Sequence, residues 1–237
     1  MTERFFVQQP IVSDRAVVEG PQAHHLIHVM RAKPGTRVVL FDGSGAEFTA
    51  EVRDVRRNDV GLSVLARELI DRELPLNLVL AVALPKGDRQ KWLIEKAVEL
   101  GVAEVVPLVT ARSVAQPVEQ ALDRLRRSVI EASKQCGRNR LMQVAEPRSW
   151  AELIASTGDI PQRLLAHPDG RPGTSSSSLS SASFPRVALA IGPEGGFSAE
   201  EVALALAAGW QPVALGARIL RVETAAIFLV ASVVAAL

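Results

Sequence analysis

The chain has 237 residues, of which 48% are hydrophobic and 22% are charged, and its formal net charge is +1. This balance is typical of a globular protein with one large core or two modest ones. No secretory signal is expected, because the stretch MTERFFVQQP at the start has no long apolar run. The longest apolar stretch, residues 225–237, is shorter than the roughly 20 residues of a membrane span. The single cysteine, Cys136, excludes an internal disulfide, which favours the reducing cytoplasm.

Positive charge is concentrated in the middle of the chain. Residues 86–140 contain 11 Lys or Arg against 7 Asp or Glu. Such an excess indicates an anionic partner, although charged helix surfaces that serve only solubility explain it equally well.

Residues 1–73 predict a small β-domain. Five short segments rich in β-branched or aromatic residues are typical of strands. They are residues 4–8, 16–20, 36–43, 47–55 and 61–69. DGSG at 42–45 predicts a hairpin turn, and HHLIHVMRA at 24–32 predicts a helical piece. Strands spaced this closely favour a closed or nearly closed β-barrel, which a linker at 71–77 follows.

Residues 74–237 predict a second, α/β domain. Apolar strands alternate with amphipathic helices, the first two at 89–100 and 119–134. This alternation predicts a mostly parallel sheet with helices on both faces. Cys136 continues the helical spacing of Leu122, Leu125, Val129 and Ala132, so it is expected in the core and not as a nucleophile. The serine-rich stretch at 168–185 predicts a surface loop.

The stretch IGPEGGFSAEE at 191–201 forms a glycine-rich elbow between a strand and a helix. RVALAIG at 186–192 predicts a buried strand, and Ser198 with Glu201 predicts a capping box at the start of a helix. Such an elbow exposes backbone N–H groups to a ligand, although ordinary turn geometry explains its glycines too. Neither the G-x-G-x-x-G fingerprint nor a P-loop is present.

A second crossing, LGARILRVETAA at 215–226, is dense in Arg and Glu, and two earlier stretches accompany it. These are LPKGDRQKWLIEKAVELGV at 84–102 and KQCGRNR at 134–140. In this order the stretches resemble the RsmE family, the ribosomal RNA small subunit methyltransferases E. HHLIHVMR at 24–31 is similar to the His-rich motif of that family. Val222, where many members carry Thr, and the long serine-rich stretch depart from the family pattern.

The resemblance implies a SPOUT methyltransferase with an N-terminal PUA-like, RNA-binding barrel. It also implies a trefoil knot near the C-terminus, which periodicity does not predict, and a homodimer with the cofactor pocket near the subunit interface. The implied reaction is methylation of N3 of a uridine in 16S ribosomal RNA of the small subunit, with S-adenosylmethionine (SAM) as the methyl donor.

The same resemblance implies the site residues. The SAM pocket would be formed by Ile191, Gly192, Pro193, Glu194, Gly195, Gly196, Leu215, Gly216, Ile219, Leu220, Arg221 and Thr224. In this interpretation the elbow glycines allow the backbone to approach the adenosine, while Leu215 and Leu220 could equally serve packing.

The reaction requires cationic donors near the uridine oxygens and a route for the N3 proton. Arg221 and Arg218 are the leading donors by position. Arg138 or Arg112 could act from a second subunit. Glu194 and Glu223 are candidates for proton acceptor or for holding an arginine.

Expected RNA contacts lie in both domains. They are His25, Arg31, Lys86, Arg89, Arg138 and Arg140. His25, His28 and Arg31 share one short helical segment, on which packing alone would explain His28. Four histidines and one cysteine give no plausible zinc set, so no metal is expected.

Three alternatives stay open from the sequence. A SPOUT enzyme with another ribosomal or transfer RNA target would carry the same motifs. A non-catalytic RNA-binding ribosome assembly factor could keep the fold, although the intact stretches 192–196 and 221–224 argue against it. A dinucleotide oxidoreductase is disfavoured by the missing fingerprint.

Overall fold

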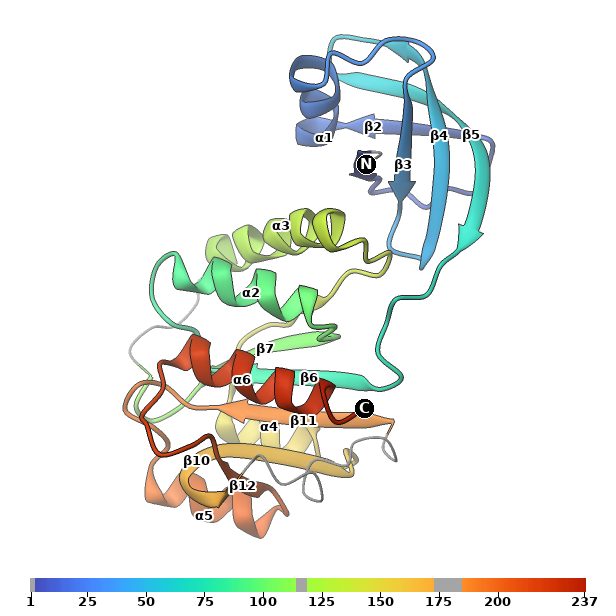
Figure 1. Ribbon diagram of the computed structural model, residues 1–237. Helices are drawn as coiled ribbons and strands as arrows, with labels where there is room; N and C mark the ends of the chain where they lie inside the picture. The colour runs from blue at the N-terminus through green and yellow to red at the C-terminus, as the bar shows by residue number, and fades with distance from the viewer. Residues whose placement is uncertain (1–2, 114–118, 173–184) are drawn as a thin grey trace. The chain divides into compact units, whose positions relative to one another are not determined.

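The computed structural model describes residues 3–113, 119–172 and 185–237 (Figure 1). It divides into two compact units. The first comprises the chain up to Glu73 together with Ile130–Leu141, and the second comprises Leu74–Val129 and Met142–Leu237. Nothing in the strand and helix pattern of the sequence predicts that residues 130–141 belong to the first unit.

The first unit is built on a five-stranded sheet with the order β1-β3-β4-β5-β2. Its strands are β1 (Arg4–Phe6), β2 (Arg15–Glu19), β3 (Arg37–Phe41), β4 (Ala46–Val55) and β5 (Asp59–Leu69). Among these described strands, only β1 and β3 pair in parallel. The sheet curls into a half-barrel (Figure 1), and because the described strands include no β1–β2 pair, it is open at this seam. The barrel is therefore less closed than the strand spacing suggests.

One face of this sheet carries the core of the first unit. Along β4, Ala46, Phe48, Ala50 and Val52 are buried while alternate residues are half-buried, as the period of two in a strand requires. They pack with other buried side chains, including Phe5, Leu26, Leu40 and Leu62. Leu26 comes from the predicted helical piece, which forms as helix α1 (Gly20–His24) and the π-helical turn η1 (His25–Val29).

The second unit contains a seven-stranded sheet whose strands all pair in parallel, as predicted. The order is β12-β10-β11-β6-β7-β8, with β9 also paired to β7. The strands are β6 (Asn77–Val82), β7 (Glu104–Val109), β8 (Gln143–Val144), β9 (Arg148–Ser149), β10 (Gln162–Pro172), β11 (Arg186–Ile191) and β12 (Gln211–Ala214). Residues 168–172 continue β10, so the predicted surface loop does not begin at 168. Residues 173–184 of that loop lie outside the described part of the chain.

Helices cover both faces of this sheet (Figure 1). Helices α2 (Arg89–Glu99) and α6 (Val222–Val234) pack together on one face, and α6 also contacts β6 and β11. Helices α4 (Trp150–Ser156) and α5 (Ala199–Ala207) contribute Trp150, Leu153 and Ala205 to the core of the other face. The chain thus leaves β12 at the sheet edge and returns as α6 to the centre. Whether it threads a loop there, as a trefoil knot requires, stays a prediction.

Helix α3 (Glu119–Cys136) buries most of its predicted apolar stripe. Leu122, Leu125, Val129 and Ala132 are at most 6% exposed. Cys136 is only half-buried, so the expectation that it belongs to the core is wrong. It lies in the last turn, where its Sγ is 4.0 Å from the carbonyl oxygen of Ser133.

No helix in the described ranges is both long enough and apolar enough to cross a membrane.

Gly170 allows β10 to lie against β12. A Cβ atom at Gly170 would lie 2.5 Å from the backbone nitrogen of Val213, whereas a Cβ at Gly158 would meet nothing closer than 3.9 Å. We expect Gly170→Ala to lower the free energy of unfolding by about 1–3 kcal/mol, because two strand backbones must separate. Gly158→Ala is the matched control and should change stability by less than about 0.5 kcal/mol. Urea denaturation of both variants measures this, and equal stabilities would contradict it.

Candidate functional site

The glycine-rich elbow lies directly after β11. The predicted capping box is confirmed: the Ser198 hydroxyl accepts the Glu201 N–H at 3.2 Å, and the Glu201 carboxylate accepts the Ser198 N–H at 2.8 Å. Within the elbow, the Gly196 N–H donates to the Pro193 carbonyl at 2.8 Å. The turn from strand to helix is therefore fixed by hydrogen bonds within the elbow and at the start of the helix.

Two elbow glycines have local reasons to be glycine. Gly196 has φ +69°, a conformation that side chains disfavour. A Cβ at Gly192 would lie 2.9 Å from the Phe197 ring, which packs on Trp150 with ring centroids 4.7 Å apart. Gly195 is exposed, and its nearest neighbour is the side chain of Arg112. A Cβ at Gly195 would lie 3.4 Å from the Arg112 side chain, whereas one at Gly196 would meet nothing within 4 Å, so the open space beside the elbow backbone is at Gly196.

The second crossing follows β12 and exposes most of its side chains. Gly216 turns the chain with φ +97°. Ile219 is 97% exposed, and Arg218 and Arg221 are exposed and form no ion pair with any described residue. Leu215 and Leu220 are half-buried, and Thr224 is exposed in the first turn of α6. This crossing therefore presents two unpaired guanidinium groups beside an exposed aliphatic side chain.

Arg89, in the first turn of α2, reaches acidic groups of both crossings. One guanidinium nitrogen lies 3.8 Å from the carboxylate of Glu194 in the elbow, and the other lies 3.5 Å from that of Glu223 in α6. Since β11 and β12 are parallel strands of one sheet, their carboxyl ends meet at the same edge. Glu223 is 8% exposed, and its Oε2 has no hydrogen-bond partner among the described residues. The structure thus brings Arg89, Glu194 and Glu223 together.

Arg112 holds the elbow from the end of a third strand. It follows β7, and its guanidinium donates to the Gly195 carbonyl at 2.7 Å. Glu201, which caps the helix after the elbow, also binds the segment after β7, because its Oε1 accepts the Ala111 N–H at 2.8 Å. The sequence suggested Arg112 only as a donor from a second subunit. Its contact within its own chain could have been anticipated from its place at the carboxyl end of a parallel strand.

The residues expected to bind RNA have different environments. In the first unit, His25 is half-buried, with its ring edge-on to Phe5 at 5.8 Å, and Arg31 is exposed with φ +52°. Arg138 is 4% exposed and its Nε donates to Glu73 at 3.1 Å, so little of its guanidinium is left for RNA.

The remaining expected RNA contacts are more accessible. Lys86 and Arg140 are exposed, and Arg89 is half-buried in the ion pairs described above. The described residues contain no group of three or more potential metal ligands.

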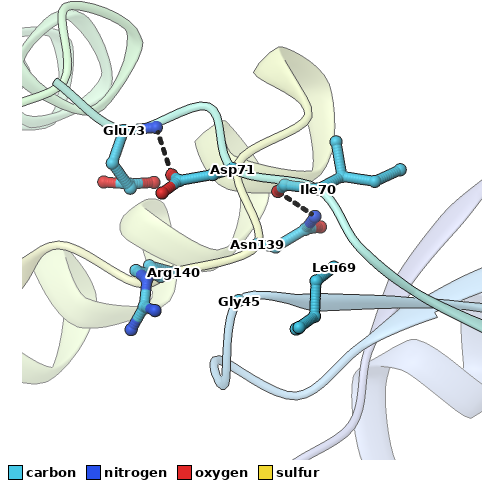
Figure 2. Close-up of a pocket in the computed structure, with 7 residues that line it drawn as sticks. All are labelled: Gly45, Leu69, Ile70, Asp71, Glu73, Asn139 and Arg140. Carbon is cyan, nitrogen blue, oxygen red and sulfur yellow. Dashed lines mark hydrogen bonds between the residues drawn. The ribbon is translucent and has the colours of Figure 1, made fainter. Parts of the chain in front are cut away.

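A cavity of ≈ 160 Å³ lies within the first unit (Figure 2). Its lining residues are Gly45, Leu69, Ile70, Asp71, Glu73, Asn139 and Arg140. The Asn139 amide donates to the Ile70 carbonyl at 3.2 Å, and Asp71 accepts the Glu73 N–H at 2.9 Å. Apart from Arg140, sequence reasoning gave none of these residues a role. They come from the β3–β4 turn, the end of β5 and the loop after α3, so only the fold brings them together.

A half-buried ion-pair network holds the neighbouring backbone. Glu47 accepts from Arg4 at 2.6 Å and from Arg72 at 3.1 Å. Arg4 also donates to the Asn139 side chain at 2.6 Å, and Arg72 donates to the Gly137 carbonyl at 2.8 Å. Burial alone would raise the pKa of Glu47, but hydrogen bonds and charge from the two arginines outweigh it and place the pKa below the ordinary 4.5.

Comparisons with known proteins agree with this arrangement. Residues 72–234 match the family model described as an RNA methyltransferase domain, and residues 18–65 match the RNA methyltransferase PUA domain. The class is therefore that of RNA methyltransferases with a PUA domain.

Individual relatives identify the family within this class. The ribosomal RNA small subunit methyltransferase E of Synechocystis is 34% identical over 92% of this chain and 72% of its own length. The corresponding enzyme of Neisseria gonorrhoeae, solved with S-adenosyl methionine, is 30% identical, has a TM-score of 0.84 and covers 98% of this chain and 96% of its own. A Legionella pneumophila protein solved with SAM is 31% identical, with a TM-score of 0.89 over 100% of this chain and 98% of its own. The chain belongs to the ribosomal RNA small subunit methyltransferase E family.

The Glu47 network predicts acid sensitivity. Because the pKa of Glu47 is lowered on folding, its contribution to stability is present above about pH 4.5 and is lost as the pH falls through the folded pKa. We expect Glu47→Gln to destabilise the protein by about 2 kcal/mol at pH 7 and by much less at pH 3. Urea denaturation across this pH range measures the difference.

Glu51→Gln is the control for this experiment. Glu51 lies on the same strand and is 3.6 Å from Arg37, whose side chain is 71% exposed, so its loss should cost less than about 1 kcal/mol. A Glu47→Gln effect that does not shrink on acidification would contradict the ion-pair assignment.

Proposed function

We propose that this protein transfers the methyl group of SAM to N3 of a uridine in 16S ribosomal RNA of the small subunit. The observation that best supports this proposal is the position of Arg89, which lies within 4 Å of acidic groups in both crossings. The two segments that the family resemblance assigns to the cofactor thus lie at one edge of one sheet. Solved relatives that contain SAM support the cofactor, and the name of the Synechocystis relative supports the RNA.

In this proposal the two crossings form the walls of the SAM pocket. Ile191–Gly196 supplies backbone, which is unobstructed at Gly196, while Leu215, Ile219 and Leu220, with Gly216 turning the chain, supply aliphatic surface for the adenosine. Ile219, at 97% exposed, is an unfavourable residue to leave in water. A bound ligand or a second copy of the chain would cover it, and we include a homodimer in the proposal for this reason.

The unpaired arginines suit the chemistry of N3. When the imino proton leaves, negative charge spreads onto O2 and O4 of the uridine, and cationic donors there lower the barrier. Arg221 and Arg218 are exposed, lie in the same crossing as the aliphatic wall of the proposed pocket, and are the proposed donors. Glu194 and Glu223 hold Arg89 in position. The buried Glu223 Oε2 is the proposed acceptor for a proton or for a hydrogen bond from the substrate. Because the proposed substrate is ribosomal RNA, we include a cytoplasmic localisation in the proposal.

The proposal is tested in the source organism with the gene deleted. Mass spectrometry of 16S ribosomal RNA fragments should show loss of one N3-methyluridine, and a plasmid copy of the gene should restore it. Persistence of the modification in the deletion strain would exclude this substrate. Loss of a methyl group from another RNA would identify a different target.

Arg89→Gln tests the connection between the crossings. Removing two half-exposed ion pairs, together worth roughly 1 kcal/mol, should weaken SAM binding about fivefold. Isothermal titration calorimetry measures the SAM affinity. Because no RNA is present, an effect on SAM binding is distinguished from the loss of an RNA contact. Lys91→Gln, on the same helix with a 67% exposed side chain, is the control and should bind SAM as the wild type does. An unchanged SAM affinity in Arg89→Gln would refute the proposal that Arg89 supports the SAM pocket by connecting the two crossings.

Arg221→Ala tests the donor role. Loss of one preorganised donor should lower kcat about 10²- to 10³-fold, while stability changes by less than about 0.5 kcal/mol because the Arg221 side chain has no partner among the described residues. Single-turnover methyl transfer and urea denaturation measure the two effects. Arg127→Ala, an exposed arginine on α3, should leave kcat unchanged. Equal losses of activity and stability in Arg221→Ala would indicate a structural role.

A further inference from the structure

Arg140 is held flat against a glycine. A Cβ atom at Gly45 would lie 3.2 Å from each of Cζ, Nε and Nη2 of Arg140. Three atoms at equal distance mean that one face of the planar guanidinium rests on the backbone of Gly45, which turns with φ +94°. Arg140 forms no hydrogen bond or ion pair with another residue in the described ranges. Its in-plane N–H groups are therefore oriented by packing and unused.

Carboxylates line the cavity beside this guanidinium. In Figure 2 the carboxylates of Asp71 and Glu73 lie above the guanidinium of Arg140, and all three lie to the left of the Asn139 side chain. Glu73 is paired with Arg138, and one Asp71 oxygen accepts a backbone N–H. The second Asp71 oxygen has no partner among the described residues and can accept another hydrogen bond. The formal charges of the paired Glu73–Arg138, of Asp71 and of Arg140 sum to zero.

The walls of the cavity are fixed by the surrounding network. Arg4 links Glu47 to Asn139, and Asn139 in turn holds the Ile70 carbonyl. Arg72 holds the Gly137 carbonyl, two residues before Asn139. These bonds hold the loop that carries Asn139 and Arg140 against the segment that carries Ile70 and Asp71. A ligand therefore meets a preorganised site, which lowers the entropy cost of binding.

We propose that this cavity is a binding subsite for one unpaired nucleobase of the RNA substrate, an inference that rests on the proposed function. Arg140 donates to a carbonyl or ring-nitrogen acceptor of the base, and Asp71 accepts a base N–H. Hydrogen bonds to the edges of unstacked bases are the usual way in which proteins recognise single-stranded RNA. The exposed Leu69 at the rim supplies apolar contact for the ring.

Size and charge favour a base over a phosphate. The cavity, at ≈ 160 Å³, is below the roughly 300–1,000 Å³ of pockets for drug-sized ligands, so it suits one ring and not a whole nucleotide. A phosphate in this cavity would share it with the carboxylates of Asp71 and Glu73, and like charges repel. A neutral base with both donors and acceptors complements both sides.

The test compares two RNA probes that carry the same phosphates. Fluorescence anisotropy measures binding of the full-length protein to decauridylate and to an abasic deca-ribonucleotide, without SAM, at several salt concentrations. Arg140→Gln should weaken decauridylate binding about tenfold, as loss of a charged hydrogen-bond pair predicts, and weaken binding of the abasic probe only by the small factor that loss of one positive charge causes. Arg140→Lys should behave like Arg140→Gln because lysine lacks the planar fork. Asp71→Asn should also weaken only decauridylate.

Arg57→Gln is the matched control. Arg57 is an exposed arginine of the same unit, without an ion-pair partner among the described residues, and its loss changes the net charge equally. It should affect both probes by the same small factor. If Arg140→Gln weakens both probes equally and lowers the salt slope by about 0.7, Arg140 contacts phosphate and the inference is overturned. No effect of Arg140→Gln on either probe overturns it as well.

Methyl transfer from radiolabelled SAM to small ribosomal subunits, measured on the wild type, separates the two proposals. Active enzyme whose decauridylate binding is insensitive to Arg140 and Asp71 refutes only the base subsite. Base-dependent binding through Arg140 without any methyl transfer supports the subsite and refutes the proposed reaction.

Discussion

The parallel alignment of β6, β7, β10, β11 and β12 is the constraint on which the candidate site depends. Parallel strands release their chain at one edge, so the segments after β7, β11 and β12 meet there although more than 100 residues separate Arg112 from Arg221. Two arginines then connect them. Arg112 binds the backbone of the elbow, and Arg89 lies between Glu194 and Glu223. The elbow is therefore restrained from two sides before any ligand arrives.

The first unit uses the same chemistry for a different purpose. Arg4, Arg72 and Arg138 are each bonded to a carboxylate or a carbonyl within that unit. Their charges neutralise Glu47 and Glu73 and fix loops that have no regular structure. Arg140, in the same loop as Arg138, is left without a partner among the described residues. A basic motif thus divides into one buried arginine that maintains the fold and one exposed arginine that is available to a ligand.

Sequence reasoning succeeded where local chemistry decides the outcome. The parallel α/β sheet followed from apolar runs alternating with amphipathic helices, and the capping box from Ser198 and Glu201. It failed where the partner is distant in sequence. Nothing local distinguishes Arg138 from Arg140, because burial of Arg138 depends on Glu73, 65 residues away. The open seam of the half-barrel, the extension of β10 to residue 172 and the half-buried Cys136 likewise depend on tertiary neighbours. The roles of individual residues in the SAM pocket stay predictions.

Glu201 illustrates how such a scaffold limits evolutionary change. Its carboxylate caps α5 through the Ser198 N–H and also holds the Ala111 N–H next to Arg112. Both partners are backbone N–H groups, so a mutation of another side chain cannot replace either of them. A substitution at this one position would release the helix start and the neighbouring loop together, and no single second mutation could compensate for both. Residues that serve two backbone segments in this way should drift more slowly than their partial solvent exposure suggests.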